Sequence, residues 1–144
     1  MKLNKKLDDK FAELTESNEG RRSSPYFCTA GKITVGVGRN LQDNPLSDNE
    51  IDYLFKRDRR TVVEDLHEAV EGFWTMPEPI QLVLCDMRFQ LGPSRFRGFE
   101  KMIAAAEEHR WADMIEEMKD SKWCEQTPNR ARKLIDIIGD YNGK

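Results

Sequence analysis

A mainly α, α+β fold is what this sequence predicts, as one compact domain or as two small lobes that share a helix. Apolar residues recur at helical spacing over most of the chain, whereas residues 33–38 alternate as in a strand. The chain has 144 residues, 38% of them hydrophobic, which is enough for a core of real size.

The first expected element is an amphipathic helix over about residues 3–18. Its apolar stripe consists of Leu3, Leu7, Phe11 and Leu14. Gly20 follows Glu19 directly, and this favours a helix end at Glu19 because glycine readily adopts the left-handed conformation found there. We therefore expect the helix to deliver Glu19 to the start of the next segment.

A β-hairpin is expected next, with its turn at Ala30-Gly31. Its second strand places one set of residues on one face, which we expect to pack on a core: Ile33, Val35 and Val37. The other face carries Thr34, Gly36 and Gly38, and is nearly bare around one hydroxyl. Such a surface is typical of a place where a ligand approaches the backbone closely.

A long helix over about residues 48–71 follows the loop 40–46. Ser47 and Glu50 form a capping box at its start. Its apolar face consists of Ile51, Leu54, Phe55, Val62, Val63, Leu66, Ala69 and Val70. Asp58 lies on the same face, and a charge there needs a partner, for which we expect Arg39.

The last half of the chain is expected to be helical. A helix over about 79–91 is apolar nearly all round and should be the buried central helix, ending at Gly92-Pro93. Shorter helices are expected near 99–108, 111–119 and 128–138. Thr127 and Pro128 supply the N-cap and the first position of the last one.

Charge and composition exclude several classes of protein. The net charge of −3 divides into +3 over residues 1–39, −6 over 40–80 and zero over 81–144, so a basic stripe for nucleic acid is absent. No apolar run approaches the roughly 20 residues that span a bilayer. The first ten residues lack the apolar region of a secretory signal, so we expect synthesis into the cytoplasm. Three scattered cysteines and two isolated histidines predict neither a disulfide framework nor a metal site, and no cofactor is expected.

One constellation and a second, independent run of residues carry a family resemblance. In the first, Glu19 is followed after eight intervening residues by Cys28, and Cys28 after five more by Thr34; the Gly-x-Gly sequence at the end of the expected strand comes next. Later come, in order, Phe89-Gln90-Leu91-Gly92, Gly98-Phe99, Arg110-Trp111, Ser121-Lys122-Trp123 and Gln126 to Ala131. This pattern resembles the T-even phage-type lysozymes, the endolysins of glycoside hydrolase family 24, over nearly the whole chain. The resemblance implies a single lysozyme-like domain of two lobes: a hairpin lobe of about 19–46, a linking helix of about 48–71, and a helical lobe of about 72–144 that includes the helix 3–18.

The resemblance also implies an activity, namely hydrolysis of the β-1,4 bond between N-acetylmuramic acid and N-acetylglucosamine in bacterial peptidoglycan. Glu19 would be the general acid. Cys28 would act as base, as nucleophile or, with Thr34, as holder of the attacking water, and water attack from the far face predicts inversion. An unperturbed thiol is mostly neutral at pH 7, so it is a poorer base than Asp.

Further roles follow from the resemblance alone. Phe89, Gln90 and Asn40 would contact the sugar, and Arg130 would approach Glu19. Arg39 stands where the family often has His, and Asp58 stands where that His has its acidic partner. A monomer is implied, acting on the wall from the cytoplasm of an infected bacterium once another protein has opened the membrane.

Structural alternatives stand beside these roles. Glu19 is otherwise an ordinary residue at a helix end, Cys28 a small apolar filler and Thr34 a strand former. Phe89 and Gln90 are otherwise core residues. At the level of the whole protein, the alternatives are a non-catalytic wall-binding or scaffold protein that retains the fold, and a DNA-binding helical regulator built on residues 129–133.

Overall fold

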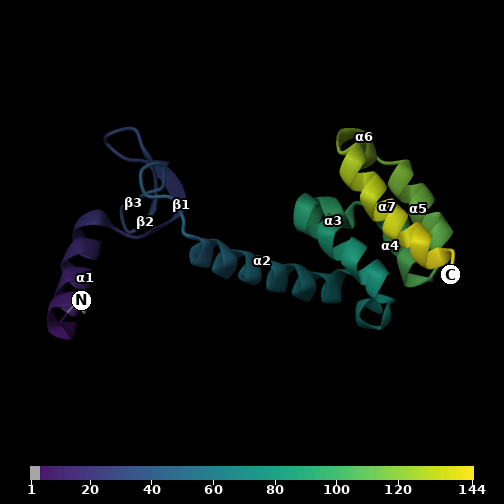
Figure 1. Cartoon of the computed structure of the whole chain (residues 1–144), viewed down its shortest axis with the longest axis horizontal. Helices are drawn as coiled ribbons and strands as arrows, with labels where there is room; N and C mark the ends of the chain where they lie inside the picture. Colours follow the sequence, from purple (N-terminus) through teal and green to yellow (C-terminus); the bar gives the residue numbers. More distant parts are fainter. Residues whose placement is uncertain (1–3) are drawn as a thin grey trace. The chain divides into compact units, whose positions relative to one another are not determined.

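The computed structural model describes residues 4–144, so Leu3 of the expected first helix lies outside the described residues. The described chain forms seven α-helices, one 3-10 helix and a three-stranded antiparallel sheet (Figure 1). This confirms the predicted mainly α, α+β class. Two compact units divide the chain: the first ends at Asp52 and the second spans Tyr53–Lys144.

The first unit begins with helix α1, Lys5–Glu19. The Asn4 side chain caps its start by accepting the N–H of Lys6 at 2.9 Å. Strands β1 (Arg22–Phe27), β2 (Ile33–Gly36) and β3 (Arg39–Asn40) follow, with β2 in the centre. Gly31, with φ +75°, donates its N–H to the Cys28 carbonyl at 2.8 Å and closes the β1–β2 turn. The turn predicted at Ala30-Gly31 is confirmed.

The expected strand over 33–38 is shorter in the structure. Gly36 and Gly38 have φ of +68° and +61°, so the chain leaves β2 and turns back into β3. The alternation stops there, and the expected core face is wrong: Ile33 is 40% exposed and Val37 is 38% exposed. Thr34 is instead the buried residue of β2, at 3% exposure.

Helix α2 spans Asp48–Ala69 and starts with the predicted capping box. Ser47 donates its N–H to Glu50 Oε1 at 2.9 Å, and Glu50 donates its N–H to Ser47 Oγ at 3.3 Å. The predicted apolar face is only half buried. Val62 and Leu66, with Val70 after the helix, join the core, while Ile51, Leu54 and Phe55 are exposed.

Helix α3, Glu78–Arg97, follows a short 3-10 helix, η1, at Phe73–Thr75. It breaks where predicted, because Gly92 has φ +81° and Pro93 cannot continue the hydrogen-bond ladder. A short helical stretch then runs on to Arg97. The expectation that 79–91 is buried all round is wrong on one side, where Leu82 and Phe89 are 56% and 45% exposed.

The remaining helices are α4 (Glu100–Glu107), α5 (Trp111–Lys119), α6 (Lys122–Gln126) and α7 (Pro128–Asn142). Helix α6 was not expected, although Ser121 marks its start by accepting the Cys124 N–H at 3.1 Å. Pro128 begins α7 as predicted. Thr127 does not cap it through its side chain, because its hydroxyl donates to the Trp123 carbonyl at 2.9 Å.

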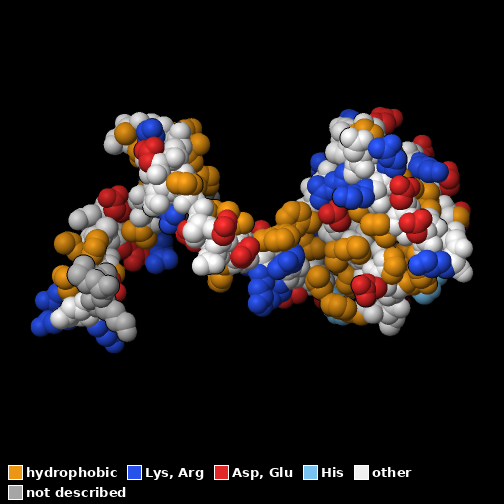
Figure 2. Space-filling model, viewed as in Figure 1, with side chains coloured by type: hydrophobic (Ala, Val, Ile, Leu, Met, Phe, Trp, Pro, Cys, Tyr) orange, Lys and Arg blue, Asp and Glu red, His pale blue; other side chains and the backbone are white. Residues whose placement is uncertain are grey.

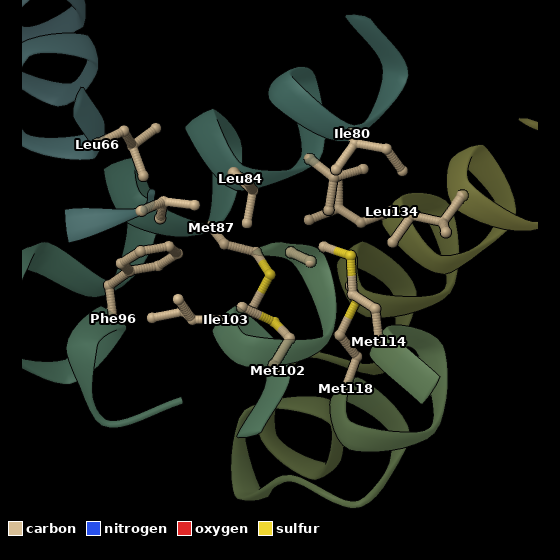
Figure 3. Close-up of a cluster of buried hydrophobic side chains, with 14 of the residues drawn as sticks. Leu66, Ile80, Leu84, Met87, Phe96, Met102, Ile103, Met114, Met118 and Leu134 are labelled. Carbon is tan, nitrogen blue, oxygen red and sulfur yellow. The ribbon is translucent and has the colours of Figure 1, made fainter. Parts of the chain in front are cut away.

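The core belongs to the second unit and is rich in methionine (Figure 3). Met87 of α3, Met102 of α4, and Met114 and Met118 of α5 are at most 1% exposed. Unbranched thioether side chains fill the irregular spaces between these short, differently oriented helices. None of the helices in the described part of the chain is both long and apolar enough to cross a membrane.

Candidate active site

Glu19 is the last residue of α1, at the point where the chain turns toward the sheet. Gly20 has φ +78°, as predicted, and donates its N–H to the Glu16 carbonyl at 2.8 Å. Glu16 in turn binds Arg21, with Oε1 and Nε 2.5 Å apart. The Glu19 side chain is exposed, so a ligand that binds to the first unit can reach its carboxyl group.

The carboxyl group of Glu19 lies directly against Gly38, between β2 and β3. A Cβ atom placed on Gly38 would be 2.7 Å from Oε2 and 2.9 Å from Cδ of Glu19. The end of α1 and the end of the hairpin therefore meet at these two residues. This contact joins Glu19 to the sheet that carries Cys28 and Thr34.

Cys28 and Thr34 lie together beside the β1–β2 turn. The backbone N–H groups of Lys32 and Ala30 lower the pKa of the Cys28 thiol, and the Thr34 hydroxyl adds a smaller contribution in the same direction. Such donors stabilise the thiolate. The thiol is half-buried and therefore still reachable from solvent.

The Thr34 hydroxyl has one proton and two possible acceptors. It donates to the Lys32 carbonyl at 3.0 Å, and rotation would direct the same proton to the Cys28 sulfur. In the described residues Glu19 has no hydrogen bond to Cys28 or to Thr34. The pair Cys28–Thr34 and the acid Glu19 are therefore separate groups on the same unit.

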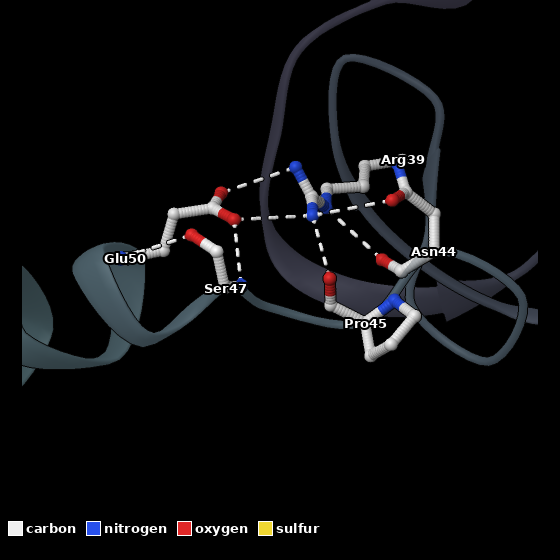
Figure 4. A network of polar contacts seen from close by, with 5 residues as sticks. All are labelled: Arg39, Asn44, Pro45, Ser47 and Glu50. Atoms are coloured by element: carbon white, nitrogen blue, oxygen red, sulfur yellow. Dashed lines mark hydrogen bonds and ion pairs between the residues drawn. The ribbon is translucent and has the colours of Figure 1, made fainter.

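Arg39 has a partner other than the expected one (Figure 4). Its guanidinium binds the Glu50 carboxylate, with Nη1 3.1 Å from Oε2, and donates to the Pro45 carbonyl at 2.8 Å and the Asn44 carbonyl at 3.2 Å. The partner expected from the sequence was Asp58, which belongs to the second unit; within the first unit Arg39 pairs with Glu50. Asp58 lies on an exposed part of α2, where a charge needs no partner because water solvates it.

Asn40 uses its side chain within its own loop. Its carbonyl oxygen accepts the N–H groups of Gln42 and Asp43 at 3.0 and 3.1 Å, and its amide donates to Asp43 Oδ2 at 2.9 Å. These bonds shape the loop 40–43. A sugar contact at Asn40 would therefore compete with bonds that the loop already makes.

The second unit carries Phe89, Gln90 and Arg130, and two of them, Phe89 and Arg130, line a groove of about 420 Å³. Its walls include Val62 and Val63 of α2 and Leu82 and Phe89 of α3. Phe89 is 45% exposed and packs edge-on against Phe55, with ring centroids 5.8 Å apart. It is therefore a surface aromatic residue and not a core residue.

Arg130 lines the same groove and binds Asp86, at 2.8 Å from Nε and 2.9 Å from Nη2 to the two carboxylate oxygens. Asp86 was missed by the sequence analysis. An acidic residue inside an otherwise apolar helix was the available signal, because such a residue needs a cation. The two-point bond holds the Arg130 guanidinium flat against α3.

Gln90 faces Trp123 rather than an open surface. Its side-chain oxygen accepts the Trp123 indole N–H at 2.8 Å, and Trp123 is only 3% exposed. The Gln90 amide N–H groups stay available for a ligand, since the oxygen alone is engaged. Trp111 and Trp123 both pack on the core.

Comparison with known proteins decides the family. The family model described as "Phage lysozyme" matches residues 16–136. The chain belongs to the phage lysozyme family. The matched range includes every candidate site residue named above, so a lysozyme-like function is supported for this chain.

Three relatives are similar at low identity. "Probable T4-type lysozyme 2" and "Probable T4-type lysozyme 1" of Dictyostelium discoideum are 23% and 24% identical, each over 88% of this chain and 91% of the relative. "Pre-baseplate central spike protein Gp5" of Enterobacteria phage T4 is 26% identical over 88% of this chain, but only 27% of its own length is matched. The same module thus occurs by itself and within a larger phage protein.

Charges on the lysozyme-family chain are mixed rather than segregated. On the face drawn in Figure 2, Lys and Arg are interspersed with Asp and Glu over the second unit. Among residues 4–144, no three His, Cys, Asp or Glu side chains gather as metal ligands would. Among the three residues predicted to be catalytic, Glu19 and Cys28 carry titratable side chains and Thr34 does not.

Proposed function

We propose that this chain is a muramidase that hydrolyses the β-1,4 bond between N-acetylmuramic acid and N-acetylglucosamine in bacterial peptidoglycan. One observation carries the proposal: the Glu19 carboxyl group lies on the hairpin that presents Cys28 and Thr34. Glycoside hydrolysis needs an acid for the leaving oxygen and a second group that handles water or the anomeric carbon. Membership of the phage lysozyme family supports the same reaction.

In the proposed mechanism Glu19 donates its proton to the glycosidic oxygen as the bond breaks. Water attacks the anomeric carbon from the opposite face, held by the Thr34 hydroxyl and the Cys28 sulfur. The lowered pKa of Cys28 increases the thiolate fraction at neutral pH, and a thiolate accepts a hydrogen bond or a proton from that water. Direct water attack gives inversion at the anomeric carbon.

Two residues of the second unit are proposed to bind the sugar. Phe89 offers an exposed ring to the apolar face of a pyranose, and the free amide N–H groups of Gln90 suit an N-acetyl carbonyl. We further propose that the setting is lysis of a bacterial host, with the wall reached after another protein opens the membrane. Peptidoglycan is the proposed partner and the monomer the proposed state.

The test is loss of turbidity of Gram-negative cells stripped of their outer membrane. We expect clearing by the wild type, and loss of at least 100-fold in rate with Glu19→Gln, because an amide cannot donate a proton as an acid does. Glu13→Gln is the matched control: it removes an exposed carboxyl from the same helix and should keep the wild-type rate. Circular dichroism checks that each variant is folded.

Cys28 is tested in the same assay. If the thiolate is the base, Cys28→Ala loses most of the activity and Cys28→Asp restores it; if it only helps Thr34 hold water, Cys28→Ala loses about tenfold or less. The anomer released, followed by NMR, reports inversion or retention. A folded wild type that pellets with walls but does not cleave them would contradict the muramidase and support a wall-binding protein.

A further inference from the structure

We infer that Gly38 is a positioning residue for the acid: because Gly38 has no side chain, the Glu19 carboxyl group can lie directly against the hairpin backbone at this position. The inference deepens the proposed function and rests on it for the role of Glu19 as the acid. The contact on which it is based, between Gly38 and Glu19, lies within the first unit.

The contact leaves no room for even one methyl group. An ideal Cβ on Gly38 would lie 2.7 Å from Oε2, 2.9 Å from Cδ and 3.1 Å from Cγ of Glu19. Carbon atoms in van der Waals contact are about 3.5–4.0 Å apart. Any residue other than glycine at position 38 therefore forces one of the two partners to move.

The backbone of Gly38 is the partner that resists movement. The next residue, Arg39, pairs with Val35 across the sheet, and Asn40 pairs with Thr34. The Arg39 guanidinium is bound to Glu50 and to the carbonyls of the loop that leads into α2 (Figure 4). The hairpin end is thus fixed from both sides of the turn.

The Glu19 side chain is the partner that gives way. It is exposed, ends a helix and has three rotatable bonds, so it moves at little cost in packing. A methyl group at position 38 therefore shifts the acid and leaves the fold intact. A displacement of about 1 Å of a reacting group can cost about 100-fold in rate.

Gly36 provides a matched control within the same turn. Its φ of +68° is close to the +61° of Gly38, so alanine meets a similar left-handed strain at both positions. A Cβ on Gly36, however, has no heavy atom within 4 Å. Gly36→Ala and Gly38→Ala therefore share the backbone strain, and only the second displaces Glu19.

The experiment compares wild type, Gly36→Ala and Gly38→Ala by three measurements: thermal unfolding, turnover of peptidoglycan, and the ¹³C NMR titration of the Glu19 carboxyl carbon. We expect similar losses of melting temperature in the two variants. Turnover of Gly38→Ala should fall at least tenfold below that of Gly36→Ala, in kcat more than in KM. The Glu19 carboxyl resonance should shift in Gly38→Ala alone.

A second variant separates position from strain. Glu19→Asp shortens the side chain by one methylene and withdraws its carboxyl from position 38, so adding Gly38→Ala to it should cost little further turnover. Equal behaviour of Gly36→Ala and Gly38→Ala, in turnover and in the carboxyl resonance, would overturn the inference. If the wild type does not cleave peptidoglycan, the proposed function fails, and the carboxyl resonance still decides whether Gly38 positions Glu19.

Discussion

Asp65 of α2 and Arg88 of α3 form a largely buried ion pair, with Oδ2 and Nε 2.5 Å apart. The Arg88 side chain is 9% exposed and that of Asp65 is 19% exposed. Arg97, near the end of α3, binds the other carboxylate oxygen at 2.6 Å. One carboxylate of α2 is thus bound by two guanidinium groups from the two sides of the break at Gly92.

Replacing Asp65 by Asn is expected to destabilise the second unit by about 3 kcal/mol, because the buried Arg88 charge then lacks its counter-ion. All three tryptophans, Trp74, Trp111 and Trp123, lie in this unit, so tryptophan fluorescence during urea unfolding of the full chain reports its stability. Asp113→Asn is the control, since Asp113 pairs with Arg110 in an exposed bridge and should lose less than about 1 kcal/mol. Equal losses of unfolding free energy in the two variants would contradict the expectation that a buried ion pair contributes more to stability than an exposed one.

The same pair predicts how stability depends on pH. Hydrogen bonds from Arg97, and then from Arg88, hold the pKa of Asp65 below its usual range in the folded chain. A lowered folded-state pKa contributes stability above the unfolded pKa of about 3.9 and loses it as pH falls through the folded value. The stability difference between wild type and Asp65→Asn should therefore be full at pH 6 and shrink below about pH 4. A constant difference down to pH 2.5 would argue against this linkage.

Cys28 should react with iodoacetamide faster than Cys85 at neutral pH. Backbone N–H groups lower the pKa of the Cys28 thiol, whereas burial and the nearby Asp86 raise the pKa of Cys85. The thiolate is the reacting form, so the rate profile of Cys28 should reach its plateau at a lower pH. Peptide mass spectrometry measures both sites in one sample. Thr34→Val removes one smaller donor and should raise the midpoint for Cys28 slightly without changing Cys85.

Gln90 is expected to have a structural role as well as the proposed one at the sugar. Gln90→Met removes the acceptor of the Trp123 indole N–H and leaves that buried donor unpaired, which should cost about 1–2 kcal/mol. Gln126→Met changes an exposed residue at the end of α6 and serves as the control. Urea unfolding followed by circular dichroism measures both. An unchanged free energy of unfolding in Gln90→Met would leave sugar binding as the sole role of this side chain.

The sequence by itself determined those features that neighbouring residues make among themselves. The end of α1 at Glu19-Gly20, the turn at Ala30-Gly31, the Ser47–Glu50 box and the break at Gly92 were all predicted and are all present. Each depends on residues at most a few positions apart, on their preferred φ and on their short-range hydrogen bonds. The family pattern of Glu19, Cys28 and Thr34 could likewise be recognised from the sequence, because it consists of a spacing along the chain.

Tertiary structure decided the partners of the charged and polar side chains. Arg39 binds Glu50, Asp65 binds Arg88 and Arg97, and Asp86 binds Arg130, 44 residues away. Periodicity shows that a residue lies on a given face of its helix, but several acidic residues on other elements satisfy the same rule. Which of them lies within hydrogen-bond distance depends on how the elements of each unit pack. The contact of Gly38 with Glu19 also depends on tertiary structure. The lack of a side chain on Gly38 matters only because the Glu19 carboxyl group, from a different element, lies where a Cβ atom of residue 38 would be.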